Sequence, residues 1–186
     1  MAEKITITEA LAELKTLGKR IPKKEEFSLQ YIARSEGVRD PLEKSVPGGS
    51  PVAITRERQA IADLQKRHVA IRTSIQKSNH VVTITVADMT KTVAEWLTWR
   101  KEIAPGLQQF LTKMRMQVVN HRDQAQKRGN AVVSATAISG TEKPTDIVIN
   151  VDEQALAAEA EQLENILGTL DGALSLKNAT TFIELA

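Results

Sequence analysis

The chain has 186 residues and a mass of 20.5 kDa, which suits one compact domain with a sizeable apolar core. Hydrophobic residues make up 41% and charged residues 26%, so extended disorder is disfavoured, and the formal net charge is +2. The sequence contains no cysteine, which excludes a disulfide framework, a thiolate zinc site and a cysteine nucleophile. No signal-peptide pattern and no run of 18 apolar residues is present, so we expect a cytoplasmic protein that does not insert into a membrane.

The charge is divided unevenly along the chain. Residues 1–128 hold 23 Lys and Arg against 14 Asp and Glu, whereas residues 129–186 hold 2 against 9. The balances of +9 and −7 therefore predict a basic helical region, 1–128, and an acidic region, 129–186, within one compact domain. Opposite charges attract each other either within one chain or between neighbouring copies.

The first predicted helix begins at a capping box. Thr6 and Glu9 have the spacing at which each side chain can bond to a backbone N–H of the first turn. Apolar residues then recur at helical spacing as far as Ile21. We expect Pro22 to end or kink this helix, because proline removes a helical hydrogen bond.

Residues 36–53 contain three prolines and three glycines and predict an arm without regular structure. Such a segment is either disordered in the free protein or docked on a surface. Its apolar residues are too scattered to form a core, so we interpret them as contacts for assembly: Val38, Leu42, Val46 and Val52.

A long amphipathic helix is predicted over residues 54–78. Its apolar stripe needs a cover, from this chain or from another, and is our first candidate interaction surface: Ile61, Leu64, His68, Ile71 and Ile75. Residues 81–86 alternate in the manner of a short β-strand.

A second capping box, Thr92 with Glu95, predicts the next helix, although Asp88 or Thr90 are equally possible starts. Its apolar positions include Ile103, Leu107, Phe110, Leu111, Met114 and Val118. Residues 104–106, Ala-Pro-Gly, predict a kink or a break. The stripe keeps its phase across this point, which favours the kink.

The acidic region is predicted to contain a β-hairpin and a final helix. Residues 131–138 and 147–151 are rich in Val and Ile, and with 81–86 they are expected to form a three-stranded sheet. The final helix carries the second candidate stripe: Leu156, Leu163, Leu167, Leu170 and Leu174. The expected fold is mainly α, with long antiparallel amphipathic helices in a bundle or coiled-coil-like arrangement and a small β-element.

The sequence offers little support for catalysis. No phosphate-binding glycine loop is present, and the three histidines, His68, His80 and His121, lack metal-ligand spacing. Ser74 and Lys77 match the spacing of a nucleophile motif, but the companion motifs are missing. We therefore expect no catalytic residue, cofactor or metal ion.

Three segments carry a resemblance to known proteins: ITITEALAELKTLGKRIPKK, SIQKSN and TVAEWLTWRKEIAP. Within residues 5–24 and 70–105 the chain resembles small helical proteins of bacteriophages and prophages. It is more distantly similar to the septicolysin-like helical family. The resemblance implies a phage-encoded virion component, such as a capsid- or tail-associated subunit, found in the host cytoplasm or in the virion.

These observations together favour a non-catalytic structural protein that binds copies of itself or phage structural proteins. A nucleic-acid-binding accessory factor is the first alternative, because basic residues of the first 128 positions could contact phosphates. Acidic residues lie between them, and few aromatic side chains are available to stack on bases, so this alternative is less favoured. A cytoplasmic helical adaptor is the second alternative.

Overall fold

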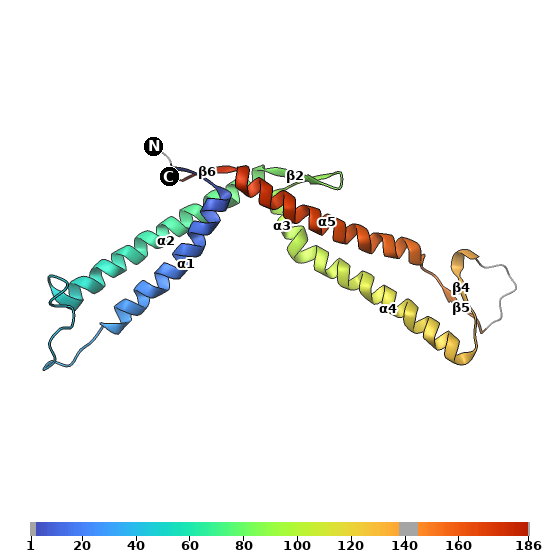
Figure 1. The fold of residues 1–186 in the computed structure, drawn as a ribbon, viewed down its shortest axis with the longest axis horizontal. Coiled ribbons are helices and arrows are strands. Elements are labelled where there is room, and N and C mark those ends of the chain that lie inside the picture. Colours follow the sequence, from blue (N-terminus) through green and yellow to red (C-terminus); the bar gives the residue numbers. More distant parts are fainter. Residues whose placement is uncertain (1–2, 138–144, 186) are drawn as a thin grey trace. The chain divides into compact units, whose positions relative to one another are not determined.

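A computed structural model describes residues 3–137 and 145–185, and it confirms a mainly α fold (Figure 1). The helices are α1 (Ile7–Gln30), α2 (Gly49–Val81), α3 (Val93–Thr98), α4 (Ala104–Arg128) and α5 (Glu153–Thr180), with a π-helical turn η1 (Trp99–Ile103) and a 3-10 turn η2 (Ala135–Ala137). The strands are β1 (Glu3–Thr6), β2 (Thr83–Val86), β3 (Met89–Thr92), β4 (Val132–Ser134), β5 (Ile147–Ile149) and β6 (Phe182–Leu185).

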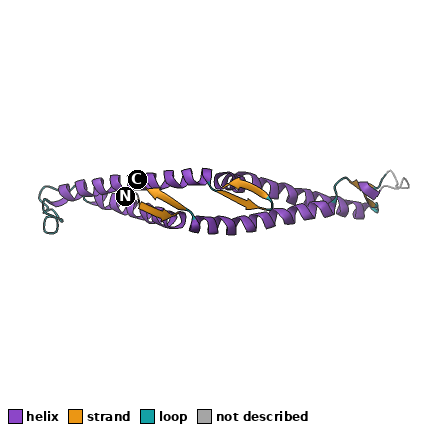
Figure 2. Ribbon diagram, turned by 90° about the horizontal axis from the view of Figure 1, so that it is seen from above, coloured by secondary structure: helices purple, strands orange, loops and turns teal. Residues whose placement is uncertain are grey.

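The chain forms two compact units, and this division differs from the predicted boundary at residue 128. Unit 1 comprises Met1–Val82 and Ser175–Ala186, and unit 2 comprises Thr83–Leu174. In unit 1, α1 and α2 lie side by side as an antiparallel pair (Figures 1 and 2). Helix α5 contributes to both units, since its last residues belong to unit 1.

Three pairs of strands form the β-structure of the described residues (Figure 2). β1 pairs with β6 and β2 pairs with β3, both antiparallel, whereas β4 and β5 are parallel. The predicted hairpin of 131–138 and 147–151 is therefore wrong in its direction. The predicted three-stranded sheet is also wrong, because a two-residue turn brings β3 directly onto β2. The strand predicted over residues 81–86 is β2, which begins at Thr83 because α2 continues to Val81.

Both predicted capping boxes are confirmed. The Thr6 hydroxyl oxygen accepts a bond of 3.2 Å from the Glu9 backbone N–H, and the Glu9 carboxylate accepts one of 2.8 Å from the Thr6 N–H. Thr92 and Glu95 repeat this arrangement at 3.2 and 2.7 Å. Thr92 is therefore the N-cap of α3, and the alternative starts Asp88 and Thr90 lie in the β2–β3 turn and within β3.

Two prolines act differently. Pro22 was expected to end or kink its helix, but α1 continues through it to Gln30, so an end at Pro22 is wrong. Pro105 lies in the first turn of α4, and the interruption before it takes the form of η1, where the Ala104 N–H donates to the carbonyl of Trp99, five residues earlier. Such a turn inserts one extra residue into a helix and lets it continue on the far side.

The sequence folds as two structural repeats, residues 3–86 and 89–185. Each repeat consists of a strand, a helix that starts at a Thr–Glu capping box, a connection, a long helix and a second strand. The strand pairs also match in register. In β1–β6, Glu3 lies opposite Leu185 and Thr6 opposite Phe182, while the equivalent residues of β3–β2 pair in the same order.

The buried side chains repeat with the same spacing. Positions at the start of the first helix of each repeat, before the extra residue of η1, are 86 residues apart, and positions in the second helix and last strand are 99 apart. The equivalent buried pairs are Ile7 and Val93, Ala10 and Trp96, Ile71 and Leu170, Ile75 and Leu174, Ile84 and Ile183, and Val86 and Leu185. Two similar local cores are thus built from different side chains.

The π-helical turn marks the difference between the first helices of the repeats. In α1, buried Leu17 follows Ala10 by seven residues, whereas buried Ala104 follows Trp96 by eight. The extra residue falls in η1. Because η1 absorbs it, α4 regains the inward phase that α1 has without interruption.

Candidate interaction surfaces

The predicted apolar stripes are covered by their own chain. Ile71 and Ile75 belong to the core of unit 1, together with residues of α1 and β6. Leu156, Leu163, Leu170 and Leu174 are buried, and Ile61, Leu64, His68 and Leu167 are partly buried. We predicted these ten residues as an interaction surface whose cover comes from this chain or from another, and for the buried ones the cover comes from this chain.

The predicted arm is docked on the N-terminus of α2. This helix begins at Gly49, five residues before the predicted start, so only residues 31–48 form the connection. The Asp40 carboxylate accepts bonds of 2.8 Å from the Ser50 N–H and 2.6 Å from the Ser50 hydroxyl. It also accepts one of 2.9 Å from the Leu42 N–H. These bonds, those from Ser50 first, hold the pKa of Asp40 below its ordinary value.

Of the four apolar residues predicted as contacts of the arm, two are partly buried and two are exposed. Leu42 and Val46 are partly buried, while Val38 and Val52 are exposed. Since Asp40 ties the connection to α2, the docked alternative holds for this segment, and its docking surface is the chain's own helix.

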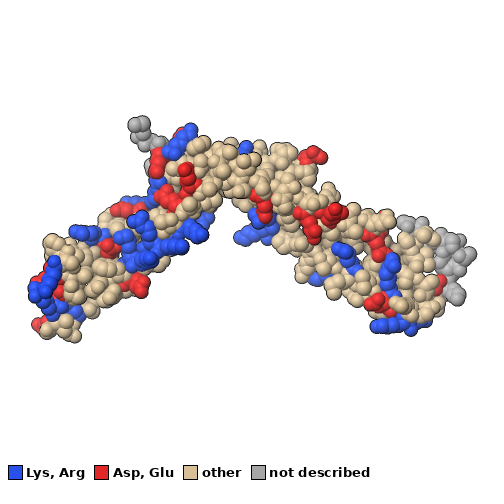
Figure 3. Space-filling view, in the orientation of Figure 1, with Lys and Arg blue, Asp and Glu red and all other residues tan. Residues whose placement is uncertain are grey.

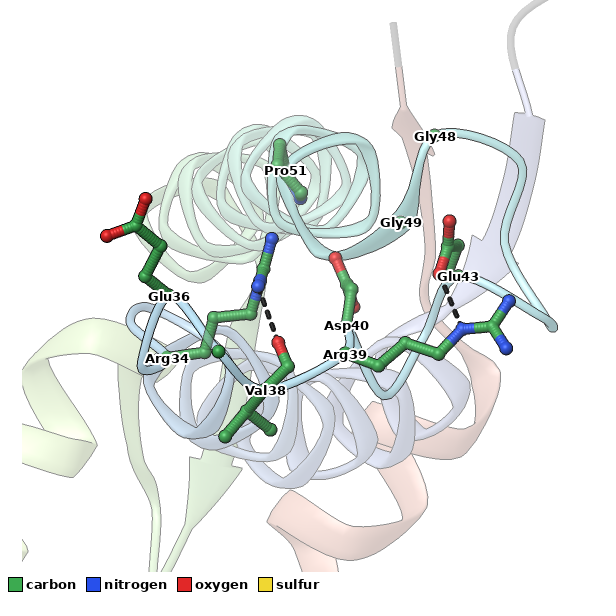
Figure 4. A pocket seen from close by; sticks show the side chains of 10 residues that line it. Arg34, Glu36, Val38, Arg39, Asp40, Glu43, Gly48, Gly49 and Pro51 are labelled. Atoms are coloured by element: carbon green, nitrogen blue, oxygen red, sulfur yellow. Dashed lines mark hydrogen bonds and ion pairs between the residues drawn. The ribbon is translucent and has the colours of Figure 1, made fainter.

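A shallow hollow of about 690 Å³ lies beside this connection (Figure 4). Arg34 donates from Nη1 to the Val38 carbonyl at 2.6 Å, and Arg39 pairs with Glu43 at 2.8 Å. The Asp40 carboxylate already takes the first free N–H of α2, where an anion would otherwise bind. The hollow therefore results from the folding of the connection onto α2, and the N-terminus of this helix is already occupied by Asp40.

A three-way ion pair joins β1, α1 and α2 in unit 1. Arg67 contacts the Glu13 carboxylate through Nε at 2.8 Å and Nη2 at 3.0 Å, and the Glu3 carboxylate through Nη1 at 2.7 Å. The bidentate bond to Arg67 lowers the pKa of Glu13, and the two carboxylates raise the pKa of Arg67. The cluster is a structural tie, because each of its charges is paired.

A buried tryptophan organises unit 2. Trp96 is fully buried, and its Nε1 donates a bond of 3.0 Å to the carbonyl of Ile84 in β2. The Trp99 ring meets it edge-on at 5.5 Å between centroids, and the Lys91 ammonium lies 5.2 Å from the Trp96 ring centroid. These contacts fix α3 against the β2–β3 pair.

Large apolar side chains remain uncovered along η1 and α4. Ile103, Leu107 and Phe110 follow one another at helical spacing, and Phe110 is 58% exposed. On another part of α4, Met116 and Val119 are 59% and 56% exposed and line a shallow hollow of about 360 Å³. The sequence pattern placed Phe110 in an apolar stripe, but periodicity cannot tell which residues of a stripe are buried and which remain exposed.

Charged groups are distributed differently over the two units. Unit 1 holds 16 Lys and Arg against 11 Asp and Glu, while unit 2 holds 9 against 12. On the face drawn in Figure 3, Lys and Arg gather over α1 and α2, with acidic groups between them. Some of these basic side chains form ion pairs within the chain, such as Lys24 with Glu57 at 2.6 Å.

The described residues contain no group of three or more His, Asp or Glu placed to hold a metal ion. Every buried side-chain polar atom in that same part of the chain has a hydrogen-bond partner. None of the described helices combines the length and the apolar character needed to cross a membrane.

The comparisons with known proteins are sparse. Neither a family model nor a curated protein matches the chain. A solved structure, described as a functionally unknown conserved protein from Corynebacterium diphtheriae, is similar over 97% of this chain and 99% of that chain, with 17% identity and a TM-score of 0.47.

Proposed function

We propose that this chain is a non-catalytic assembly protein that acts through contacts with other protein surfaces, copies of itself among them. The uncovered apolar side chains of η1 and α4 carry this proposal. Exposed apolar groups that gather on one element, rather than occurring singly, are typical of protein interaction sites.

The core between α4 and α5 is complete without the exposed side chains of α4. In unit 2, Ala104 and Leu111 of α4 already pack against Leu156 and Leu163 of α5. The exposed Phe110, next to Leu111, is therefore not needed for that core. Because an exposed phenylalanine gains little stability in the isolated chain, a partner surface is the simplest use for it.

We propose a bacteriophage virion as the setting, with the chain as a capsid- or tail-associated subunit. The support for this setting is the sequence resemblance of residues 5–24 and 70–105 to small phage proteins. Virion assembly joins many copies through repeated contacts, which suits an uncovered helix surface.

A nucleic-acid accessory role is the second candidate, favoured by the excess of Lys and Arg in unit 1. Phosphate contacts would make such binding strongly salt-dependent, whereas apolar contacts are far less sensitive to salt. Salt dependence therefore separates the two candidates.

Size-exclusion chromatography with light scattering, at several salt and protein concentrations and with or without DNA, tests the proposal. We expect association that persists at high salt and weakens in the double variant Leu107→Ser, Phe110→Ser, which changes neighbouring exposed positions of α4. Both side chains are exposed, so the fold should be retained, which circular dichroism checks.

Leu29→Ser, Ile32→Ser is the matched control, since these side chains are exposed apolar residues of unit 1. It should associate like the unaltered chain. A monomer at every concentration that binds DNA tightly and loses it with salt would reverse the order of the two candidates. A monomer without DNA binding would overturn self-association.

A further inference from the structure

The two equivalent strand pairs are connected in different ways. β2 and β3 are joined by the two-residue turn of Ala87 and Asp88, whose φ angles of 47° and 63° suit a tight hairpin. β1 and β6 have the same register but are joined only through residues 7–181. The β1–β6 pair is thus the one that can come apart without opening a turn.

β6 is held in unit 1 by contacts with β1, α1 and α2. Ile183 and Leu185 are buried in the core of this unit. The Ile7 N–H donates to the Thr181 carbonyl and the Ser74 hydroxyl donates to the Glu184 carbonyl, each at 3.0 Å. Every one of these contacts could be made equally well by β6 of another copy, because the sequence is the same.

The continuous helix α5 contains two glycines shortly before it enters unit 1 at Ser175. A Cβ on Gly168 or Gly172 would meet no atom within 4 Å, and neither residue has a positive φ. Neither packing nor backbone geometry therefore requires glycine here, although each costs about 1 kcal/mol of helix stability relative to alanine. The equivalent residues of α2, 99 positions earlier, are Val69 and Thr73.

We propose that a second copy of this chain is a binding partner through exchange of β6, which pairs with β1 of the other copy in the same register. The glycines of α5 supply the freedom that the exchange needs. All contacts of β6 are kept, so only its high effective concentration within one chain opposes the exchange. This proposal rests on the self-association proposed above and names a strand that carries it.

Disulfide trapping tests the exchange, because the chain has no native cysteine. The double variant Lys4→Cys, Glu184→Cys places thiols on exposed residues directly opposite each other in β1 and β6. After oxidation at increasing protein concentration, non-reducing gels should show disulfide-linked dimers or longer chains beside the internally linked monomer. Their share should rise several-fold with concentration.

The matched control is Thr85→Cys, Thr90→Cys, at the equivalent positions of β2 and β3. Its strands share a two-residue turn, so the disulfide should form within one chain at every concentration. Equal shares of linked dimer in both variants would show that the links form by random collision. Internal disulfides alone in the β1–β6 variant would show that β6 stays paired with β1 of its own chain. Either result would overturn the exchange.

Gly168→Ala, Gly172→Ala added to the trapping variant should reduce the linked share several-fold, because α5 becomes stiffer. An unchanged share would remove the glycines from the proposal. If light scattering shows association that Leu107→Ser, Phe110→Ser weakens while the β1–β6 variant forms only internal disulfides, the proposed function stands and the exchange alone fails.

Discussion

The two repeats build the same local arrangement from different kinds of side chain. Where unit 1 has Glu13 and Arg67 in an ion pair, the equivalent positions of unit 2 hold Trp99 and Ile166, with the spacings of 86 and 99 residues. Where unit 2 buries the large Trp96, unit 1 has Ala10. The comparison teaches that the pattern of buried positions, rather than the kind of side chain, defines this arrangement.

The difference has a thermodynamic consequence. A partly exposed ion pair gains little over its hydrated charges, whereas a buried indole contributes a large apolar area and a hydrogen bond. We therefore expect the stability of unit 2 to fall sharply when a single apolar side chain is removed. The stability of unit 1 should change more with pH.

The largest expected effect is that of Trp96→Ala, which removes the fully buried indole and leaves the Ile84 carbonyl without its donor. The free energy of unfolding of unit 2 should fall by about 3–5 kcal/mol. Urea denaturation followed by circular dichroism measures it. Trp99→Ala is the control, because Trp99 is only partly buried and should cost less. An equal loss in both variants would contradict the central place given to Trp96.

The next effect concerns the equivalent residues Ile71 and Leu170, both 0% exposed. Each substitution by alanine should lower the free energy of unfolding by about 2–5 kcal/mol. Trp96 and Trp99 both lie in unit 2, so Leu170→Ala should shift the fluorescence transition more than Ile71→Ala does. Val69→Ala, at an exposed site of α2, should change stability by less than about 0.5 kcal/mol. Losses that differ widely between the two buried sites would weaken their equivalence.

The smallest effect is a difference in acid sensitivity. The Arg67 bond lowers the pKa of Glu13 from its ordinary value of 4.5, so its contribution is present above that pH and is lost as the pH falls through the lowered pKa. Arg67→Ala should cost about 1 kcal/mol at neutral pH and reduce the loss of unit 1 stability on acidification below pH 4.5. Chemical denaturation at several pH values measures this.

The capping carboxylates serve as an internal control, since the pKa values of Glu9 and Glu95 are both lowered by bonds from their capping threonines. They affect the two units alike, whereas Trp99 and Ile166 do not titrate. An acid response of unit 1 that is unchanged in Arg67→Ala would show that the ion pair does not set it.

Local signals in the sequence predicted local structure well. The Thr–Glu spacings predicted both capping boxes, and helical periodicity predicted the long helices, because these features depend on residues three or four positions apart. The same periodicity left the source of the apolar cover open. It identified Ile71 and Leu170 as apolar positions but not whether their cover comes from the same chain.

Pairings between distant residues were missed. β6 was not predicted as a strand, and its pairing with β1 depends on residues at opposite ends of the described chain. One signal was available. The two capping boxes are 86 residues apart, and Asn79 and Ile84 recur as Asn178 and Ile183, which marks an internal repeat. The parallel pairing of β4 and β5 has no comparable signature in the residues that form it.

The unequal connections of the two strand pairs also set an order of events in folding. A hairpin closed by two residues, such as β2–β3, can form within about 1–10 μs. β1–β6 has to wait until residues 7–181 have brought its strands together, and such distant closure slows folding. During synthesis, the ribosome makes β6 after every other described element. The core of unit 1, in which Ile183 packs with Ile7 and Ile71, is therefore the last to receive all of its residues.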